Sequence, residues 1–418
     1  MNFREFALHV LLSLMLMVAP QLYAKVLVGS DRLKSEGVAE KLQGKTIGLI
    51  TNHTAINSAF VSTIDTLRSL SKPLHFHLIA LFAPEHGIHG ASLANQTIET
   101  TKTYDNLPIY SLYGETRRPT DEMLKGIDLL IYDIQDIGAR SYTYITTMFY
   151  AMEEAAKRGI EFIVLDRPNP INGIIVDGPM LEEKFRSMVG YINVPYCHGM
   201  TVGELANYFN AEYKVGCKLT IIPMKGWKRS MSFQETGLPW IPTSPYIPEP
   251  TTPYFYATTG ILGELKMVSI GIGYTLPFKL VGAPWIDGEK LVKELNAQKF
   301  PGVYFTSLYF CPTFGRFAKQ ACQGALIMVT DHKKFKPVST QYMILGVLKN
   351  LYPKQYLAAQ INMKEQKTML CKLNGTEEIY RILTEEKSII WKLCQVHEKE
   401  KNAFIQKRKK YLVADYDG

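Results

Sequence analysis

The sequence predicts a doubly wound α/β layer built on a mostly parallel sheet. Four short runs in the first half are almost continuously apolar, which is typical of parallel strands that are buried on both faces. Segments with helical periodicity separate these runs, and this alternation of strand and helix is the pattern of an α/β fold. The predicted strands cover 46–50, 77–82, 128–132 and 162–165.

Three segments of the first half have the periodicity of helices. The first covers 60–70. The second covers 141–158, and Gly159 directly after it is the residue type that most often ends a helix. The third covers 202–210, where Thr201 and Glu204 have the spacing of a capping box.

The second half has a different organisation. Six prolines punctuate 238–254, which excludes a regular helix or a central strand through that stretch. Aromatic residues run through it as well, so we expect an extended cover or linker. We place a domain boundary near residue 230, which divides the mature chain into domains of 25–230 and 231–418. A further helix is expected over 377–410.

The first 24 residues have the pattern of a secretory signal peptide. A charged start at Arg4, an apolar block over 7–19 and a small residue at Ala24 describe such a signal. The apolar block is short for a membrane span, and an uncleaved anchor is the alternative interpretation. We expect cleavage after Ala24, export to the periplasm, and no stable membrane span in the mature chain.

Composition excludes several classes of function. The chain is 46% hydrophobic and 21% charged, as globular proteins are, and its net charge of +8 is dispersed, so nucleic-acid binding is not expected. No Gly-x-Gly-x-x-Gly, Walker or Gly-x-Ser-x-Gly motif follows the early strands, which argues against a nucleotide cofactor and a serine hydrolase. The six cysteines form no Cys-x-x-Cys pair, and their pairing is open.

A polar cluster follows each of the four predicted strands. Because the carboxyl ends of parallel strands share one edge of a sheet, we expect the four clusters to meet in one crevice. The clusters supply Asn52 after the first strand, Glu85 and His86 after the second, Asp133, Asp136 and Arg140 after the third, and Asp166, Arg167 and Asn169 after the fourth.

Glu85 is the candidate general acid. It lies in Ala83-Pro84-Glu85-His86-Gly87, where proline and glycine force the backbone to turn directly after an apolar strand. An apolar setting would suit a general acid, and a solvated carboxylate that caps a helix is the alternative. A zinc site at this motif is not expected, because the proline and glycine oppose the helix that a His-Glu-x-x-His site requires.

The later clusters offer further roles. Asp133 or Asp136 is a candidate catalytic base, or else a partner of Arg140. Arg140 or Arg167 could grip a substrate carboxylate with a bidentate fork, although the proline-rich loop that carries Arg167 could equally be a structural corner. Tyr142 could line the crevice or pack. His198, just outside the third helix, is a candidate ligand contact.

The motifs together resemble the exo-β-N-acetylmuramidase family of exported bacterial glycoside hydrolases. The resemblance covers essentially the whole mature chain, on the runs 48–52, 81–87, 110–116, 133–140, 165–173, 198–205 and 282–287. It implies a Rossmann-like N-terminal domain and a smaller α+β C-terminal domain that forms the other wall of the cleft. It also implies release of N-acetylmuramic acid from the non-reducing ends of peptidoglycan fragments, whether muropeptides or disaccharides. The family's catalytic glutamate falls on Glu85, and the lactyl carboxylate of the sugar gives Arg140 or Arg167 a ligand.

The chain departs from the family pattern at His89, where the family has arginine, over 52–55, and in one run of the second half. The family's Ser-Glu-Gly-Arg-Gly corresponds here to Ser269-Ile270-Gly271-Ile272-Gly273, so a carboxylate and a guanidinium have both become isoleucine. Glycoside hydrolysis normally uses two carboxyl groups. A sugar-binding protein with impaired turnover and a glycosidase with altered sugar preference are therefore the alternatives. Glu264 aligns with another family glutamate and survives. The expected substrate-binding set is Asn52, His86, Arg140, Tyr142, Asp166, Arg167, Asn169, His198 and Glu264.

Overall fold

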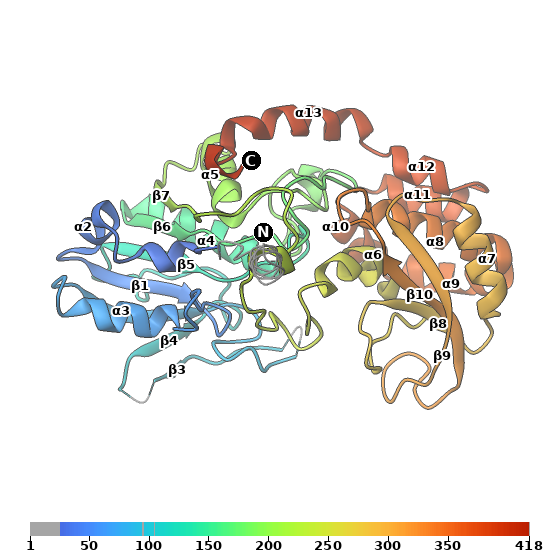
Figure 1. Cartoon of the computed structure of the whole chain (residues 1–418), viewed down its shortest axis with the longest axis horizontal. Coiled ribbons are helices and arrows are strands. Elements are labelled where there is room, and N and C mark those ends of the chain that lie inside the picture. Colours follow the sequence, from blue (N-terminus) through green and yellow to red (C-terminus); the bar gives the residue numbers. More distant parts are fainter. Residues whose placement is uncertain (1–25, 94–95, 104, 418) are drawn as a thin grey trace, which may run out of the picture.

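The first half of the chain folds into a seven-stranded sheet, seen on the left of Figure 1. The computed structural model describes residues 26–93, 96–103 and 105–417, so the predicted signal peptide lies outside the described residues. The strand order is β3-β4-β2-β1-β5-β6-β7, and only the β3–β4 pairing is antiparallel. The strands are β1 (Thr46–Thr51), β2 (His77–Ala83), β3 (Thr101–Lys102), β4 (Pro108–Ser111), β5 (Leu129–Asp133), β6 (Glu161–Leu165) and β7 (Lys218–Ile222).

This strand order confirms the predicted fold class. The chain begins in the middle of the sheet at β1, builds outward through β2 and β4, and returns to β5 on the other side of β1. That is the Rossmann arrangement, in which the order reverses between the two central strands. The four predicted strands are β1, β2, β5 and β6. The sequence pattern missed β3, β4 and β7, the outer strands, which are partly exposed and therefore lack a continuous apolar run.

Helices cover both faces of the sheet. Alternate strand residues face opposite ways, so Ile47 and Leu49 of β1 pack in one core with α3 (Thr63–Ser71), while Ile50 packs in the other with α4 (Thr143–Arg158) and α5 (Val202–Glu212). Gly159 ends α4 in the left-handed conformation, with φ of 69°. Both capping-box hydrogen bonds of α5 are present. The end of α4 at Gly159 and the start of α5 at its capping box therefore confirm the predictions from the sequence.

The second half forms a smaller α+β part around a three-stranded antiparallel sheet, on the right of Figure 1. The strand order is β8-β10-β9, with β8 (Leu280–Ala283), β9 (Val303–Phe310) and β10 (Cys322–Val329). Its helices are α6 (Thr252–Glu264), α7 (Gly288–Ala297), α8 (Pro337–Leu351), α9 (Pro353–Glu365), α10 (Lys367–Asn374), α11 (Glu378–Glu385), α12 (Ile390–Gln395) and α13 (Glu398–Arg408).

The single helix predicted over 377–410 is wrong, because three helices, α11, α12 and α13, occupy this stretch. The backbone becomes extended at Glu386, where ψ is 143°, and it turns left-handed at His397, where φ is 57°. After the second break α13 runs back along the top of the molecule toward α5 (Figure 1), where Lys407 forms an ion pair with Glu212. The end of the chain therefore packs on the first half.

A proline-rich connection joins the two parts. It runs from the end of β7 at Ile222 to the start of α6 at Thr252, and the predicted boundary at residue 230 lies inside it. Pro242 joins it to the loop after β1, since its carbonyl oxygen lies 2.7 Å from Nε2 of His53. Among the residues that the structure describes, no helix is long and apolar enough to cross a membrane. All six cysteines are free thiols.

Candidate active site

A cavity of about 460 Å³ lies where the carboxyl edge of the large sheet meets the second half of the chain. Glu85, His86 and Tyr113 line it from the loops after β2 and β4, and 141–143 line it from the start of α4. The opposite wall comes from the connection, the end of α6, and the turn before β8. Its volume is within the range of small-molecule sites.

Glu85 reaches this cavity because of the turn that follows β2. The strand ends at Ala83, and His86 and Gly87 both adopt positive φ, 70° and 77°, so the chain reverses at once. Glu85 is buried. The hydroxyl of Thr143, the first residue of α4, donates to Oε2 of Glu85 at 2.6 Å. The carboxylate is thus held between a strand end and a helix start, at the wall of the cavity.

Tyr113 is a second neighbour of Glu85. Burial raises the pKa of the Tyr113 hydroxyl to about 12, and the charge of Glu85 and a hydrogen bond with its carboxylate act in the same direction. The guanidinium of Arg117 covers the other side of the phenol, 3.4 Å from the ring centroid. Tyr113 therefore stays neutral and keeps its proton for Glu85 across the physiological pH range.

The hydrogen bonding of His86 defines its tautomer. Its Nδ1 lies 2.7 Å from the carbonyl oxygen of Ser92. A carbonyl oxygen only accepts, so Nδ1 carries a proton, and in the neutral form of the ring Nε2 is then an acceptor. His86 lines the cavity, and a sugar hydroxyl is a suitable donor to Nε2.

Aromatic rings form much of the wall beside Glu85. Tyr142 lies edge-on to Tyr256 at 5.9 Å between centroids, and Tyr256 lies edge-on to Phe278 at 5.2 Å. The Tyr142 hydroxyl donates to Oγ1 of Thr243 at 3.0 Å, which fixes the connection to α4. Tyr142 thus lines the cavity and also packs, so both sequence interpretations of this residue hold.

The facing wall combines a carboxylate with two isoleucines. Glu264, the last residue of α6, lines the cavity. Its side chain is exposed, and the partial burial of its carboxyl raises its pKa, opposed by the charge of Lys266. Ile270 and Ile272 line the same wall. A Cβ atom on Gly263 would lie 2.5 Å from Cδ1 of Ile270, so the isoleucine packs directly on the backbone of α6. Apolar side chains fill the place where the resemblance leads to a glutamate and an arginine.

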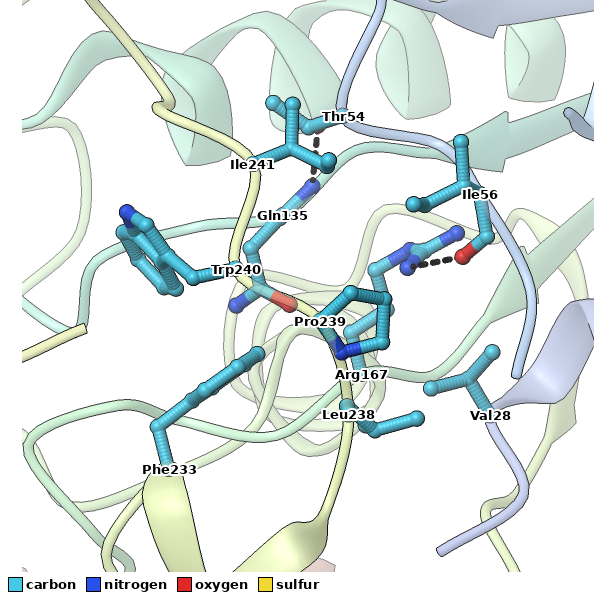
Figure 2. Close-up of a pocket in the computed structure, with 10 residues that line it drawn as sticks. All are labelled: Val28, Thr54, Ile56, Gln135, Arg167, Phe233, Leu238, Pro239, Trp240 and Ile241. Carbon is cyan, nitrogen blue, oxygen red and sulfur yellow. Dashed lines mark hydrogen bonds between the residues drawn. The ribbon is translucent and has the colours of Figure 1, made fainter. Parts of the chain in front are cut away.

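Asp133 and Arg167 form a buried ion pair away from this cavity. Nη2 of Arg167 lies 2.9 Å from Oδ2 of Asp133, which also accepts from the Thr63 hydroxyl. Figure 2 shows the guanidinium also bonded to the Ile56 carbonyl, beside Pro239 of the connection. The cavity at this point has a volume of only about 10 Å³. Neither side chain lines the larger cavity that holds Glu85.

Asp136 is also buried outside the cavity lining. Its Oδ2 accepts from the backbone N–H of Gly138 at 2.7 Å, while Oδ1 has no hydrogen-bond partner among the described residues. Burial raises the pKa of this carboxyl to about 7, opposed by the backbone hydrogen bonds. Two predicted catalytic carboxylates, Asp133 and Asp136, are therefore absent from the wall that holds Glu85.

Arg140 is enclosed by backbone carbonyls. Its Nη1 donates to the carbonyls of Pro179 and Val194, both at 2.7 Å, and its Nη2 donates to that of Leu373 at 3.1 Å. Burial lowers the pKa of the guanidinium to about 10. Because Leu373 belongs to α10, Arg140 links the two halves of the chain rather than facing the cavity.

The remaining predicted site residues form hydrogen bonds with nearby backbone groups or pack against buried neighbours. Oδ1 of Asp166 accepts from the N–H of Gly203 at 2.8 Å, and burial, with the charge of Glu204, raises the Asp166 pKa to about 7. Burial lowers the pKa of His198 to about 3, so this ring stays neutral. The Asn52 and Asn169 side-chain oxygens each accept from backbone N–H groups two residues further on. None of these residues lines the cavity.

The structure thus brings four of the predicted site residues to one cavity, namely Glu85, His86, Tyr142 and Glu264. It adds residues that the sequence pattern did not single out, namely Tyr113, Thr143, Tyr256 and Arg316. Tyr113 lies inside the run 110–116 that matches the family, so the family motif could have identified it as a site residue. Arg316 lies in a loop of the second half with no local signal. Among the described residues, no group of three or more His, Cys, Asp or Glu could hold a metal ion.

The fold and this cavity define a glycosidase-like α/β protein, in which carboxyl groups and aromatic rings face a cleft between two parts. Two family models match, the N-terminal domain of exo-β-N-acetylmuramidase NamZ over residues 47–251 and its C-terminal domain over 254–413. The chain therefore belongs to the exo-β-N-acetylmuramidase NamZ family of glycosidases, as the motifs indicated.

Known proteins resemble the chain over nearly its whole length. The peptidoglycan β-N-acetylmuramidase NamZ of Bacillus subtilis strain 168 is 41% identical over 392 residues, which covers 93% of this chain and 91% of that protein. A solved DUF1343 family protein of Bacteroides fragilis NCTC 9343 is 40% identical, with a TM-score of 0.85 over 93% of this chain and 99% of its own. A second such protein from the same organism is 27% identical, with a TM-score of 0.67 over 94% and 100%.

Proposed function

We propose that the chain is an exo-acting glycoside hydrolase that releases N-acetylmuramic acid from the non-reducing ends of peptidoglycan fragments. The observation that carries this proposal is the placement of Glu85, which lies buried at the cavity with Thr143 and Tyr113 on its carboxylate. The family of the chain and the name of its Bacillus relative support the same substrate.

Glu85 acts as the general acid. It donates a proton to the glycosidic oxygen as the bond from that oxygen to C1 breaks. Water supplies the hydroxyl group that C1 gains, and the proton that the water loses passes to a carboxylate of the site. The two hydroxyl neighbours, Thr143 and Tyr113, orient the carboxyl group toward a bound sugar. His86 accepts a hydrogen bond from a sugar hydroxyl at Nε2, and the rings of Tyr142 and Tyr256 cover its apolar face.

Glu264 supplies the second carboxyl group in this proposal, in place of Asp133 or Asp136. It lies on the wall of the cavity that also holds Glu85, whereas both aspartates are buried elsewhere. Tyr256 lies near both glutamates: its pKa is raised to about 12, mainly by burial, and the charges of Glu85 and Glu264 contribute to that rise. A sugar placed against the Tyr256 ring would therefore lie in the cavity that both carboxyl groups line.

The test is hydrolysis of two chromogenic β-glycosides, one of N-acetylmuramic acid and one of N-acetylglucosamine. Glu85→Gln keeps an oxygen that can accept from Thr143 but cannot donate a proton as an acid, so we expect turnover of the muramic substrate to fall by about 10²- to 10⁴-fold. Glu122→Gln, at an exposed position outside the cavity lining, is the matched control and should leave turnover unchanged.

The two alternatives give different results in the same assay. The isoleucines at 270 and 272 favour a sugar-binding protein, because they leave an apolar wall where a charged pair would take part in the reaction. Binding of the muramic glycoside with no release by the unsubstituted protein would support that function and contradict hydrolysis. Release of N-acetylglucosamine in preference to N-acetylmuramic acid would indicate an altered sugar preference.

Export belongs to the same proposal. Peptidoglycan fragments arise in the cell envelope, and residues 1–24 have the charged start, apolar block and small final residue of a secretory signal. We expect the mature protein to begin at Lys25 in the periplasm. Mass spectrometry of the protein recovered from the periplasmic fraction checks this, and a mature protein that keeps Met1 would contradict it.

A further inference from the structure

We propose that Arg316 binds the lactyl carboxylate of the muramic sugar, an assignment that rests on the proposed function and names its specificity residue. Arg316 is the only arginine or lysine among the described residues that line the cavity of Glu85. N-acetylmuramic acid differs from N-acetylglucosamine by the lactyl ether, which adds one negative charge. A guanidinium in the cavity is the group that recognises that difference through a bidentate pair.

The loop that carries Arg316 is held in place over the cavity. It connects β9 to β10 over 311–321. Both the N–H and the hydroxyl of Thr313 donate to the carbonyl oxygen of Gly273, at 2.7 and 2.8 Å. Gly273 has a φ of 86°, and a Cβ atom there would lie 2.1 Å from the carbonyl oxygen of Phe314. The loop therefore docks on the turn that bears Ile272, and glycine at 273 permits the contact.

The guanidinium of Arg316 is available to a ligand. Arg316 is exposed, and it forms no ion pair with any residue in the described part of the chain. The guanidinium carbon lies 4.6 Å from the centroid of the neighbouring Phe317 ring. A guanidinium that has no ion-pair partner and is held at a cavity wall by a docked loop is suited to bind an anion.

The surroundings of Arg316 match the lactyl group in more than charge. A lactyl group has a methyl and a carboxylate on the same carbon. Ile270 and Ile272 line the cavity on the turn that receives the Arg316 loop, so an apolar surface and a guanidinium come together at one wall. The isoleucines suit the methyl, and the guanidinium suits the carboxylate. The family motif has an arginine where this chain has Ile272. In this proposal Arg316, on the loop between β9 and β10, supplies that positive charge instead.

The two arginines that the sequence suggested for this role are engaged elsewhere. Arg140 is fully buried among the carbonyls of Pro179, Val194 and Leu373. Arg167 is buried in its pair with Asp133. Because neither lines the cavity, each would have to break these bonds to reach a substrate, and Arg316 would not.

Binding calorimetry tests the assignment without requiring turnover. The ligands are free N-acetylmuramic acid, its lactyl methyl ester, and N-acetylglucosamine. We expect Arg316→Ala to weaken binding of the acid by about 10- to 100-fold and to leave binding of the neutral ester unchanged. Arg316→Lys, which keeps the charge but loses the fork, should fall between. Lys319→Gln removes a charge from the same loop at a position outside the cavity lining, and it should bind like the unsubstituted protein.

The ester separates this inference from the proposed function. If the unsubstituted protein prefers the acid and Arg316→Ala loses that preference, the assignment stands even when the chromogenic glycoside is not hydrolysed. If Arg316→Ala weakens the acid and the ester equally, or weakens neither, Arg316 does not bind the carboxylate, whether or not Glu85 is catalytic. An unsubstituted protein that binds the acid no better than N-acetylglucosamine also overturns the assignment.

Discussion

Glu85 and Asp133 are both carboxylates at the ends of parallel strands, and the position of each relative to its strand sets them apart. Asp133 is the last residue of β5 and still pairs in register with Thr51 of β1, so its side chain remains inside the layer. There it needs a buried cation, which Arg167 supplies. Glu85 lies two residues beyond the end of β2, past a turn, and so reaches the cavity.

The buried pair leads to a prediction about stability. Arg167→Met leaves the Asp133 carboxylate buried without its cation, and we expect a loss of about 3–5 kcal/mol in the free energy of unfolding. Lys45→Met, which breaks the half-exposed pair with Glu161, should cost at most about 1 kcal/mol and is the control. Urea denaturation measures both. Unchanged stability in Arg167→Met, together with lost turnover, would instead support a direct role for this pair in the reaction.

Asp136 leads to a prediction about pH. Its pKa of about 7 in the folded protein lies above the usual value of 3.8, so the folded state binds this proton more tightly than the unfolded state. The resulting stabilisation is fully present below about pH 4 and is lost as the pH rises to 7 and above, by up to about 4 kcal/mol. Asp136→Asn removes this titration and should be more stable than the unsubstituted protein at pH 8.

The difference between these two proteins isolates Asp136, because Asp166 titrates with the same sign in both. Free energies of unfolding should be compared from pH 4 to pH 8. The stability of Asp136→Asn relative to the unsubstituted protein should rise across this range. A difference that does not change with pH would mean that Asp136 keeps an ordinary pKa in the fold.

At the scale of elements, sequence patterns predicted the central strands and the helices with clear end signals. Continuous apolar runs identified β1, β2, β5 and β6, and Gly159 and Thr201 identified helix ends. The patterns could not show which polar strand ends face a cavity. The side chains of Asn52 and Asn169 bond to the backbone of their own turns, and a pattern of polar residues does not distinguish this use from substrate binding. Arg316 was missed because its loop reaches the cavity only through docking on Gly273.

The C-terminal segment after α13 is an element whose role only the folded structure reveals. The hydroxyl of Tyr416 accepts from the N–H of Met224 at 2.8 Å and donates to Oδ2 of Asp166 at 2.7 Å. The ring lies edge-on to Trp227, with 4.9 Å between centroids. These contacts hold the start of the connection against the large sheet. That start lies nearly 200 residues before Tyr416 in the chain.

Tyr416→Phe tests this closure. The substitution leaves two buried groups, the Met224 N–H and an Asp166 oxygen, without this hydrogen-bond partner, and we expect a loss of about 2–4 kcal/mol in the free energy of unfolding. Tyr411→Phe removes a hydrogen bond to Glu212 at a half-buried position and should cost about 1 kcal/mol or less. Equal costs for the two substitutions would show that the Tyr416 hydroxyl is no more important than a surface contact.

At the scale of the whole molecule, the cavity exists only because two parts of the chain stay together. Glu85 and Thr143 come from the first part, and Glu264, Ile270 and Arg316 come from the second. Besides the connection, the parts are joined by the bond from Arg140 to the Leu373 carbonyl and by the return of α13, where Arg408 donates to the His198 carbonyl at 3.0 Å. The site is therefore as stable as the contact between the parts.

We accordingly expect the mature protein to unfold in one cooperative transition, with equal calorimetric and van't Hoff enthalpies. Under the proposed function N-acetylmuramic acid binds only the assembled cavity, so it should raise the midpoint of that whole transition, and at 100 times its Kd the gain is about 2.7 kcal/mol. Arg140→Met removes the hydrogen bonds to carbonyls of both parts, and we expect the variant to unfold in two transitions. N-acetylmuramic acid should then no longer raise the midpoint of the second transition. Differential scanning calorimetry with and without the sugar measures this. Two transitions in the unsubstituted protein would show that the parts fold independently and that the cavity forms by docking of finished domains.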